Sequence, residues 1–231
     1  MNARFRPAGG GKPEVYLRCL EASLDRGRSG VVLVPEIGLT PAASGAVERR
    51  FGAQAAVLHS ALSDGERWRE WQRIRECQAR VVVGPRSALF APLPDLGFIA
   101  VDEEHDAAYK QQEAPRYHAR DLALVAAQRL AIPVLMCSAT PSVEASALVE
   151  RGLARHLRLT RRVAGGELPQ VELVDLRGEP PEPGEQGRTL FSRRLRECLS
   201  ETVQQGDQVI LLMQRRGWAP IRRWCRRRCA R

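Results

Sequence analysis

The chain has 231 residues, and its 44% of apolar residues is enough to build a hydrophobic core, which argues against a disordered protein. Thirty-six Lys and Arg against 27 Asp and Glu give a formal charge of +9. That excess is typical of a protein that meets a polyanion such as nucleic acid, and equally of GC-rich coding sequence.

The sequence also carries signals of location. No apolar run approaches 18 residues, which excludes a membrane span, and the first residues lack the apolar core of a secretory signal. The six cysteines are scattered, as in proteins of a reducing compartment. We therefore expect a cytoplasmic protein.

Short apolar runs alternate with amphipathic segments over the first 140 residues. This alternation predicts parallel βαβ units, and so an α/β fold with a mainly parallel sheet flanked by helices. Each run is apolar on both faces, as in a sheet that is covered on both sides. Strands are expected at 30–36, 55–59, 79–85, 96–104 and 132–140, and helices at 13–27, 63–78 and 119–131.

Each predicted strand has polar residues at its carboxyl end, in the order Pro-Glu, His-Ser, Gly-Pro-Arg-Ser, Asp-Glu-Glu-His and Ser-Ala-Thr. An open α/β sheet binds its ligands at the carboxyl ends of its strands. The five clusters therefore predict one ligand-binding edge.

The pattern changes after residue 160. A linker-like stretch comes first, and then a strand at 171–176, a Pro/Gly-rich loop, a helix at 192–207 and a strand at 208–217 are expected. One such unit buries little core, so this part is predicted to be an unfinished second domain.

Gly11 and Lys12 precede the first predicted helix, as in turns that bind phosphate through backbone N–H groups and a lysine. The full P-loop pattern has Ser or Thr next, but this chain has Pro13, which offers neither an N–H nor an oxygen. A flexible glycine stretch before a proline-initiated helix fits these residues as well.

Asp102, Glu103 and Glu104 end the fourth predicted strand. In nucleotidases of this architecture, a strand-end Asp holds Mg²⁺ and the next Glu polarises the attacking water, which suits Asp102 and Glu103. His105 would then sense the γ-phosphate or the neighbouring lobe. A solvated acidic turn is one alternative, and a metallohydrolase that uses His59, His105 and His118 is another.

The longest run, residues 81–125, together with 32–40, 58–71 and 137–145, resembles consecutive motifs of the superfamily 2 DNA helicases of bacterial replication restart, the PriA or primosomal protein N′ family. The resemblance covers about residues 9–221. It implies an ATP-dependent DNA helicase of primosome assembly that uses ATP and Mg²⁺ and binds single-stranded and forked DNA. It also implies a RecA-like P-loop NTPase lobe at 1–160, and a linker and truncated second lobe at 161–231.

The resemblance assigns roles residue by residue. Gly9, Gly11, Lys12 and His105 would bind ATP, Asp102 and Glu103 would hold Mg²⁺ and activate water, and Ser138, Ala139 and Thr140 would couple hydrolysis to DNA movement. The residues expected to bind DNA are Thr40, Arg86, Ser87, Tyr109, Lys110, Arg116 and Tyr117. Guanidinium groups bind phosphate in a fork, and tyrosines stack on bases.

Four departures from the family lower the expected activity. The family's N-terminal domains and a clear strand before the P-loop are missing, Pro13 and Pro85 stand at motif positions, and the chain ends where the zinc-binding module should begin. Cys225 and Cys229 would supply half a zinc site at most. We therefore expect this chain to lack full helicase activity. The alternatives are a non-catalytic DNA-binding or primosome-scaffolding module, and a fragment of a degraded gene.

Overall fold

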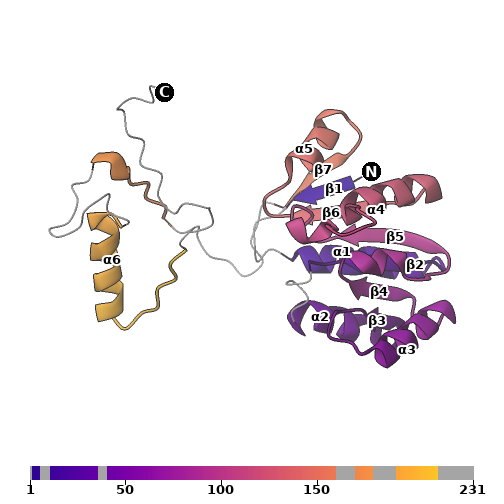
Figure 1. The fold of residues 1–231 in the computed structure, drawn as a ribbon. Coiled ribbons are helices and arrows are strands. Elements are labelled where there is room, and N and C mark those ends of the chain that lie inside the picture. The colour runs from indigo at the N-terminus through magenta and orange to yellow at the C-terminus, as the bar shows by residue number, and fades with distance from the viewer. Residues whose placement is uncertain (1, 6–10, 36–40, 160–169, 179–190, 213–231) are drawn as a thin grey trace, which may run out of the picture. The chain divides into compact units, whose positions relative to one another are not determined.

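A computed structural model of the protein describes residues 2–5, 11–35, 41–159, 170–178 and 191–212. Within residues 2–5 and 41–44 it describes the backbone alone. The chain divides into two units, Met1–Glu167 and Leu168–Arg231 (Figure 1). No helix in the described part is both long and apolar enough to cross a membrane.

The first unit is built on a seven-stranded sheet in which every neighbouring pair of strands is parallel. The strand order is β3-β4-β2-β5-β6-β1-β7. The strands are β1 (Asn2–Phe5), β2 (Ser29–Leu33), β3 (Ala55–Val57), β4 (Val81–Gly84), β5 (Leu96–Val101), β6 (Val134–Ser138) and β7 (Arg155–Arg158). The predicted α/β fold with a parallel sheet is confirmed.

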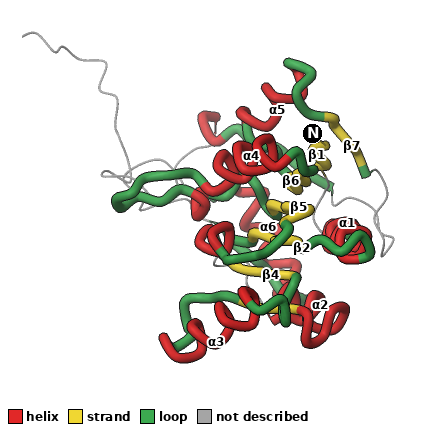
Figure 2. The backbone as a smooth tube through the Cα atoms, turned by 90° about the vertical axis from the view of Figure 1, so that its right-hand side faces the viewer, coloured by secondary structure: helices red, strands yellow, loops and turns green. Residues whose placement is uncertain are grey.

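Helices cover both faces of this sheet (Figure 2). They are α1 (Lys12–Leu24), α2 (Pro41–Phe51), α3 (Asp64–Arg75), α4 (Ala119–Leu130) and α5 (Val143–Glu150). Side chains of α1 and α2 pack on one face, with Tyr16 and Leu20 among them. Side chains of α3, α4 and α5 pack on the other, with Ile74 and Ala123 among them. The alternate residues of each strand enter the two cores, which explains why the central strands read as apolar on both faces.

β1 corrects the expectation that no strand precedes Lys12. Its sequence, Asn-Ala-Arg-Phe, carries no β-branched run, but its backbone pairs with β6 and with β7. Hydrogen bonds to the two neighbouring strands therefore define β1, which its own residue types do not predict.

The second unit differs from the prediction. Its helix, α6 (Arg193–Gln204), is confirmed and begins at Ser192, whose Oγ accepts the Leu195 N–H. Residues 171–176 and 208–212, however, form no strand. Leu173 and Ile210 are 94% and 97% exposed, and within the described residues no neighbouring strand pairs with either segment. An unpaired strand is unstable in water, which accounts for the difference.

Candidate functional site

Lys12 lies at the first position of α1, directly after Gly11, whose φ of 64° is left-handed and suits glycine. The lysine is 7% exposed, and its Nζ lies 2.5 Å from Oε1 of Glu103. These two residues are 91 positions apart in the sequence. The parallel sheet thus brings the amine and the acidic end of β5 to one edge, as the separate motifs predict.

Asp102 and Glu103 directly follow β5. Glu103 has a φ of 42°, an uncommon value for a residue other than glycine, and its N–H donates to Oδ1 of Asp102 at 2.9 Å. Burial raises the pKa of the Asp102 carboxyl, and the neighbouring charge of Glu103 raises it further. Strained backbone and a destabilised carboxylate are both typical of functional sites. A cation beside the pair would relieve the repulsion.

The residues present fit an Mg²⁺ ion that also binds phosphate. Mg²⁺ is commonly held by one or two carboxylates together with substrate phosphates, and Asp102 offers such a carboxylate. No group of three or more His, Cys, Asp or Glu in the described part of the chain is arranged to hold a metal. The alternative of a metal site built from His59, His105 and His118 therefore gains no support.

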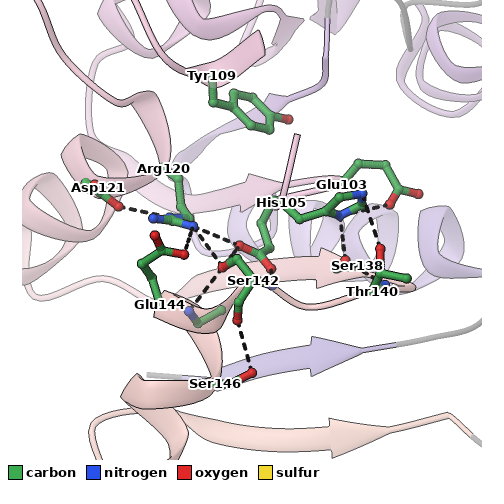
Figure 3. A network of polar contacts seen from close by, with 12 residues as sticks. Glu103, His105, Tyr109, Arg120, Asp121, Ser138, Thr140, Ser142, Glu144 and Ser146 are labelled. Carbon is green, nitrogen blue, oxygen red and sulfur yellow. Dashed lines mark hydrogen bonds and ion pairs between the residues drawn. The ribbon is translucent and has the colours of Figure 1, made fainter. Parts of the chain in front are cut away.

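His105 joins the acidic strand end to the motif after β6 (Figure 3). Its Nδ1 lies 2.7 Å from Oγ of Ser138 and its Nε2 lies 3.3 Å from Oγ1 of Thr140. The Thr140 N–H in turn donates to Oγ of Ser138 at 3.0 Å, which folds the Ser138–Ala139–Thr140 turn. The imidazole also lies 3.8 Å from Glu103. The His105 side chain therefore lies between Glu103 and this turn.

Glu104 is fully buried and was given no role by the sequence motifs. Its Oε1 accepts the Ser142 N–H at 2.8 Å, and its Oε2 accepts the Ser142 hydroxyl at 2.8 Å and Nη1 of Arg120 at 3.2 Å. Arg120, on α4, also donates to Oγ of Ser142 at 2.9 Å (Figure 3). Because Ser142 caps α5, this network joins β5, α4 and α5 behind the strand ends.

Arg86, a predicted DNA-binding residue, begins the 3₁₀ helix after β4. Its Nη1 donates to the carbonyls of Ala108 and Lys110 at 3.1 and 3.5 Å. Three other predicted DNA-binding residues are exposed. Ser87 lies on the same 3₁₀ helix as Arg86, and Lys110 and Arg116 lie on the loop 107–118. The arginine thus holds the loop that contains most of the candidate DNA-binding residues.

Tyr109 corrects one prediction. The residue is fully buried, and its hydroxyl lies 2.9 Å from the carbonyl of Leu33 and 2.5 Å from that of Asp102. A ring in this position has no free face, so Tyr109 does not stack on a base. It ties the loop to the ends of β2 and β5. Tyr117 is half-buried and remains a candidate, in edge-to-face contact with Phe90.

Four candidate residues lie outside the described part of the chain. They are Gly9, Thr40, Cys225 and Cys229. Their predicted roles in binding phosphate, DNA and zinc stay predictions.

The site thus combines three features: a lysine, the Asp-Glu pair at the end of β5, and a histidine that contacts the end of β6. The family model described as DEAD/DEAH box helicase matches residues 6–148. The chain belongs to the DEAD/DEAH box helicase family. The Asp-Glu-Glu-His of residues 102–105 differs from the Asp-Glu-Ala-His of the family's name at Glu104, the carboxylate that the buried network absorbs.

The curated relatives to which the chain is similar include proteins called replication restart protein PriA. The protein of Bacillus subtilis is 44% identical over 91% of this chain, and that of Treponema pallidum is 49% identical over 91%. The predicted resemblance is confirmed. The chain spans 26% and 31% of the length of these relatives.

Solved structures show the same helicase fold. The structure of RecG bound to a three-way DNA junction superposes with a TM-score of 0.51 and is 18% identical. The match covers 72% of this chain and 22% of the RecG chain. At this identity the match establishes the fold alone.

Proposed function

We propose that this chain carries the ATP-binding lobe of a PriA-like DNA helicase of replication restart, acting in the cytoplasm. One observation carries the proposal: Nζ of Lys12 lies against Glu103 at the carboxyl edge of the sheet, beside Asp102. Similarity to the PriA proteins supports the substrates, which are ATP and single-stranded or forked DNA, and the primosome proteins as partners. The second unit is proposed to be the start of the second helicase lobe.

The residues at this edge divide the work. Lys12 exchanges its carboxylate partner for phosphate oxygens when ATP binds, because the triphosphate carries more negative charge than one carboxylate. Glu103 is thereby freed to take a proton from the attacking water. Bound Mg²⁺ would neutralise the phosphates beside Asp102. His105 passes the change at Glu103 to Ser138 and Thr140, which we propose as the link to DNA movement.

Replacing Pro13 with threonine tests this function. Threonine restores the hydroxyl that P-loops give to Mg²⁺, so we expect Pro13→Thr to hydrolyse ATP at least about tenfold faster than the parent when single-stranded DNA is present. Pro13→Ala, which removes the ring without adding an oxygen, is the matched control and should behave like the parent. Steady-state phosphate release measures all three.

The outcomes separate the alternatives. Failure of both the parent and Pro13→Thr to bind Mg·ATP would contradict the proposal. Were both then to bind single-stranded DNA with a steep salt dependence, the chain would be the non-catalytic DNA-binding module.

A further inference from the structure

A pocket of about 480 Å³ opens where β3 and β4 end, at the same carboxyl edge of the sheet as Lys12 but not lined by Lys12, Asp102 or Glu103. Its walls come from three segments: the residues after the two strands, α3, and the loop 107–118. None of its eleven lining residues is Asp or Glu. A pocket of this size holds a ligand of the size of a nucleotide.

Two aromatic side chains line the pocket. Trp71 projects from α3 and is 38% exposed. Tyr117 comes from the loop, and its ring is oriented by Phe90, with the centroids 5.3 Å apart and the planes at 85°. Exposed aromatic rings supported from one side are the platforms on which nucleobases stack.

Two arginines supply cationic groups with free N–H donors. Arg67 lies one turn before Trp71, is exposed, and makes no side-chain hydrogen bond or ion pair with any described residue. Arg86 uses Nη1 to hold the loop, while its Nε and Nη2 donate to no acceptor in the described ranges. Free guanidinium donors in this arrangement match a phosphate group.

The carboxylates nearby on α3 do not cancel this charge. Glu66 is bound to Ser63 in the capping box at the start of the helix, at 2.7 and 2.9 Å. Both carboxylate oxygens of Glu70 accept from Nη1 of Arg73, at 2.7 and 2.8 Å. Asp64, three residues before Arg67, lines a neighbouring hollow with it but forms no ion pair with it. The Arg67 guanidinium is therefore available to a ligand.

We propose that this pocket binds one base and an adjacent phosphate of a single-stranded nucleic acid. The base stacks on Trp71 and Tyr117, and the phosphate binds Arg67 and Arg86. The inference rests on the proposed function and deepens it by adding Trp71 and Arg67 of α3 to the DNA-binding surface. An acidic peptide would use the arginines but not the stacked rings, so the aromatic pair favours a nucleobase.

Fluorescence anisotropy with labelled oligo-dT and oligo-rU tests the pocket in the full chain. Trp71→Ala and Arg67→Ala should each weaken binding of oligo-dT about tenfold, and Trp71→Phe, which keeps a stacking ring, should recover most of it. Arg67→Ala should also reduce the slope of log K against log salt by about 1, whereas Trp71→Ala leaves the slope unchanged. Comparison of the two oligomers tells DNA from RNA.

Trp68→Ala and Arg75→Ala are the matched controls. Both residues lie on α3 and are exposed, and neither lines this pocket. These variants should bind within about twofold of the parent, since only loss of a pocket contact removes stacking or phosphate binding. Binding of both oligomers by Trp71→Ala and Arg67→Ala at parental affinity would overturn the inference, and so would an absence of binding by the parent.

Mg·ATP binding, measured on the same variants, separates this inference from the proposed function. If the chain does not bind Mg·ATP but Trp71→Ala still weakens oligonucleotide binding, the proposed ATP-binding function is overturned and the proposed pocket stands. ATP binding with no Trp71 dependence would overturn the pocket and leave the nucleotide site.

Discussion

Replacing Arg120 with methionine is expected to lower the free energy of unfolding of the first unit by about 3–5 kcal/mol, because removing one partner of a buried ion pair leaves the other charge uncompensated. Glu104 is the charge left behind. It is fully buried, and without Arg120 it keeps only the two contacts from Ser142. The same change also deprives Ser142 of a donor where it caps α5.

Urea unfolding followed by circular dichroism measures this effect. Arg129→Met is the matched control, because Arg129 lies on the same helix but is exposed, and it should change stability by less than about 0.5 kcal/mol. Combining Arg120→Met with Glu104→Leu should restore part of the loss, since it removes the uncompensated charge but also takes the acceptor from the Ser142 N–H and hydroxyl. A loss below about 1 kcal/mol in Arg120→Met would show that the network does not stabilise the site.

Replacing Lys12 with methionine is expected to weaken Mg·ATP binding about 30-fold or more. Truncating one partner of a buried, hydrogen-bonded charge pair costs about 2–5 kcal/mol, and about 1.4 kcal/mol is tenfold. Lys12 is 7% exposed, so water cannot replace its contact with the phosphates. Glu103 is 40% exposed in its side chain and tolerates loss of the lysine, so the variant should fold.

Isothermal titration calorimetry with Mg·ATP provides the measurement. Lys110→Met is the control, since the chain has two lysines and Lys110 lies exposed at the loop. It should bind Mg·ATP like the parent. Equal ATP affinity of Lys12→Met and the parent would place the nucleotide elsewhere.

The strands β2 to β6 and the helices between them could be predicted because their sequences carry the burial pattern themselves. Val31 and Val32, for example, enter opposite cores and read as a continuous apolar run. β1 and β7 could not be predicted in this way. β7, Arg-His-Leu-Arg, is an edge strand whose side chains are mostly exposed, so only its pairing with β1 defines it.

The site shows the same division. Lys12, Asp102 and Glu103 could be predicted, because each belongs to a short motif and parallel strands bring such motifs to one edge. The burial of individual side chains could not be predicted. Tyr109 and Tyr117 lie eight positions apart on one loop, yet Tyr109 is fully buried and Tyr117 is half-buried. One feature of the sequence pointed to the role of Glu104: a third consecutive carboxylate after a buried strand requires a cation. Its partner Arg120 stood in a helix that reads as ordinary.

The contact between Lys12 and Glu103 can be measured directly by zero-length carbodiimide coupling, which joins an amine to a carboxylate only when the two touch. Since Lys110 is the other lysine of the chain, peptide mass spectrometry identifies the product without ambiguity. We predict a Lys12–Glu103 amide in the free protein that Mg·ATP suppresses, because phosphate displaces the carboxylate. Coupling of Lys12 to other carboxylates instead, or a yield that Mg·ATP leaves unchanged, would contradict a nucleotide site at this edge.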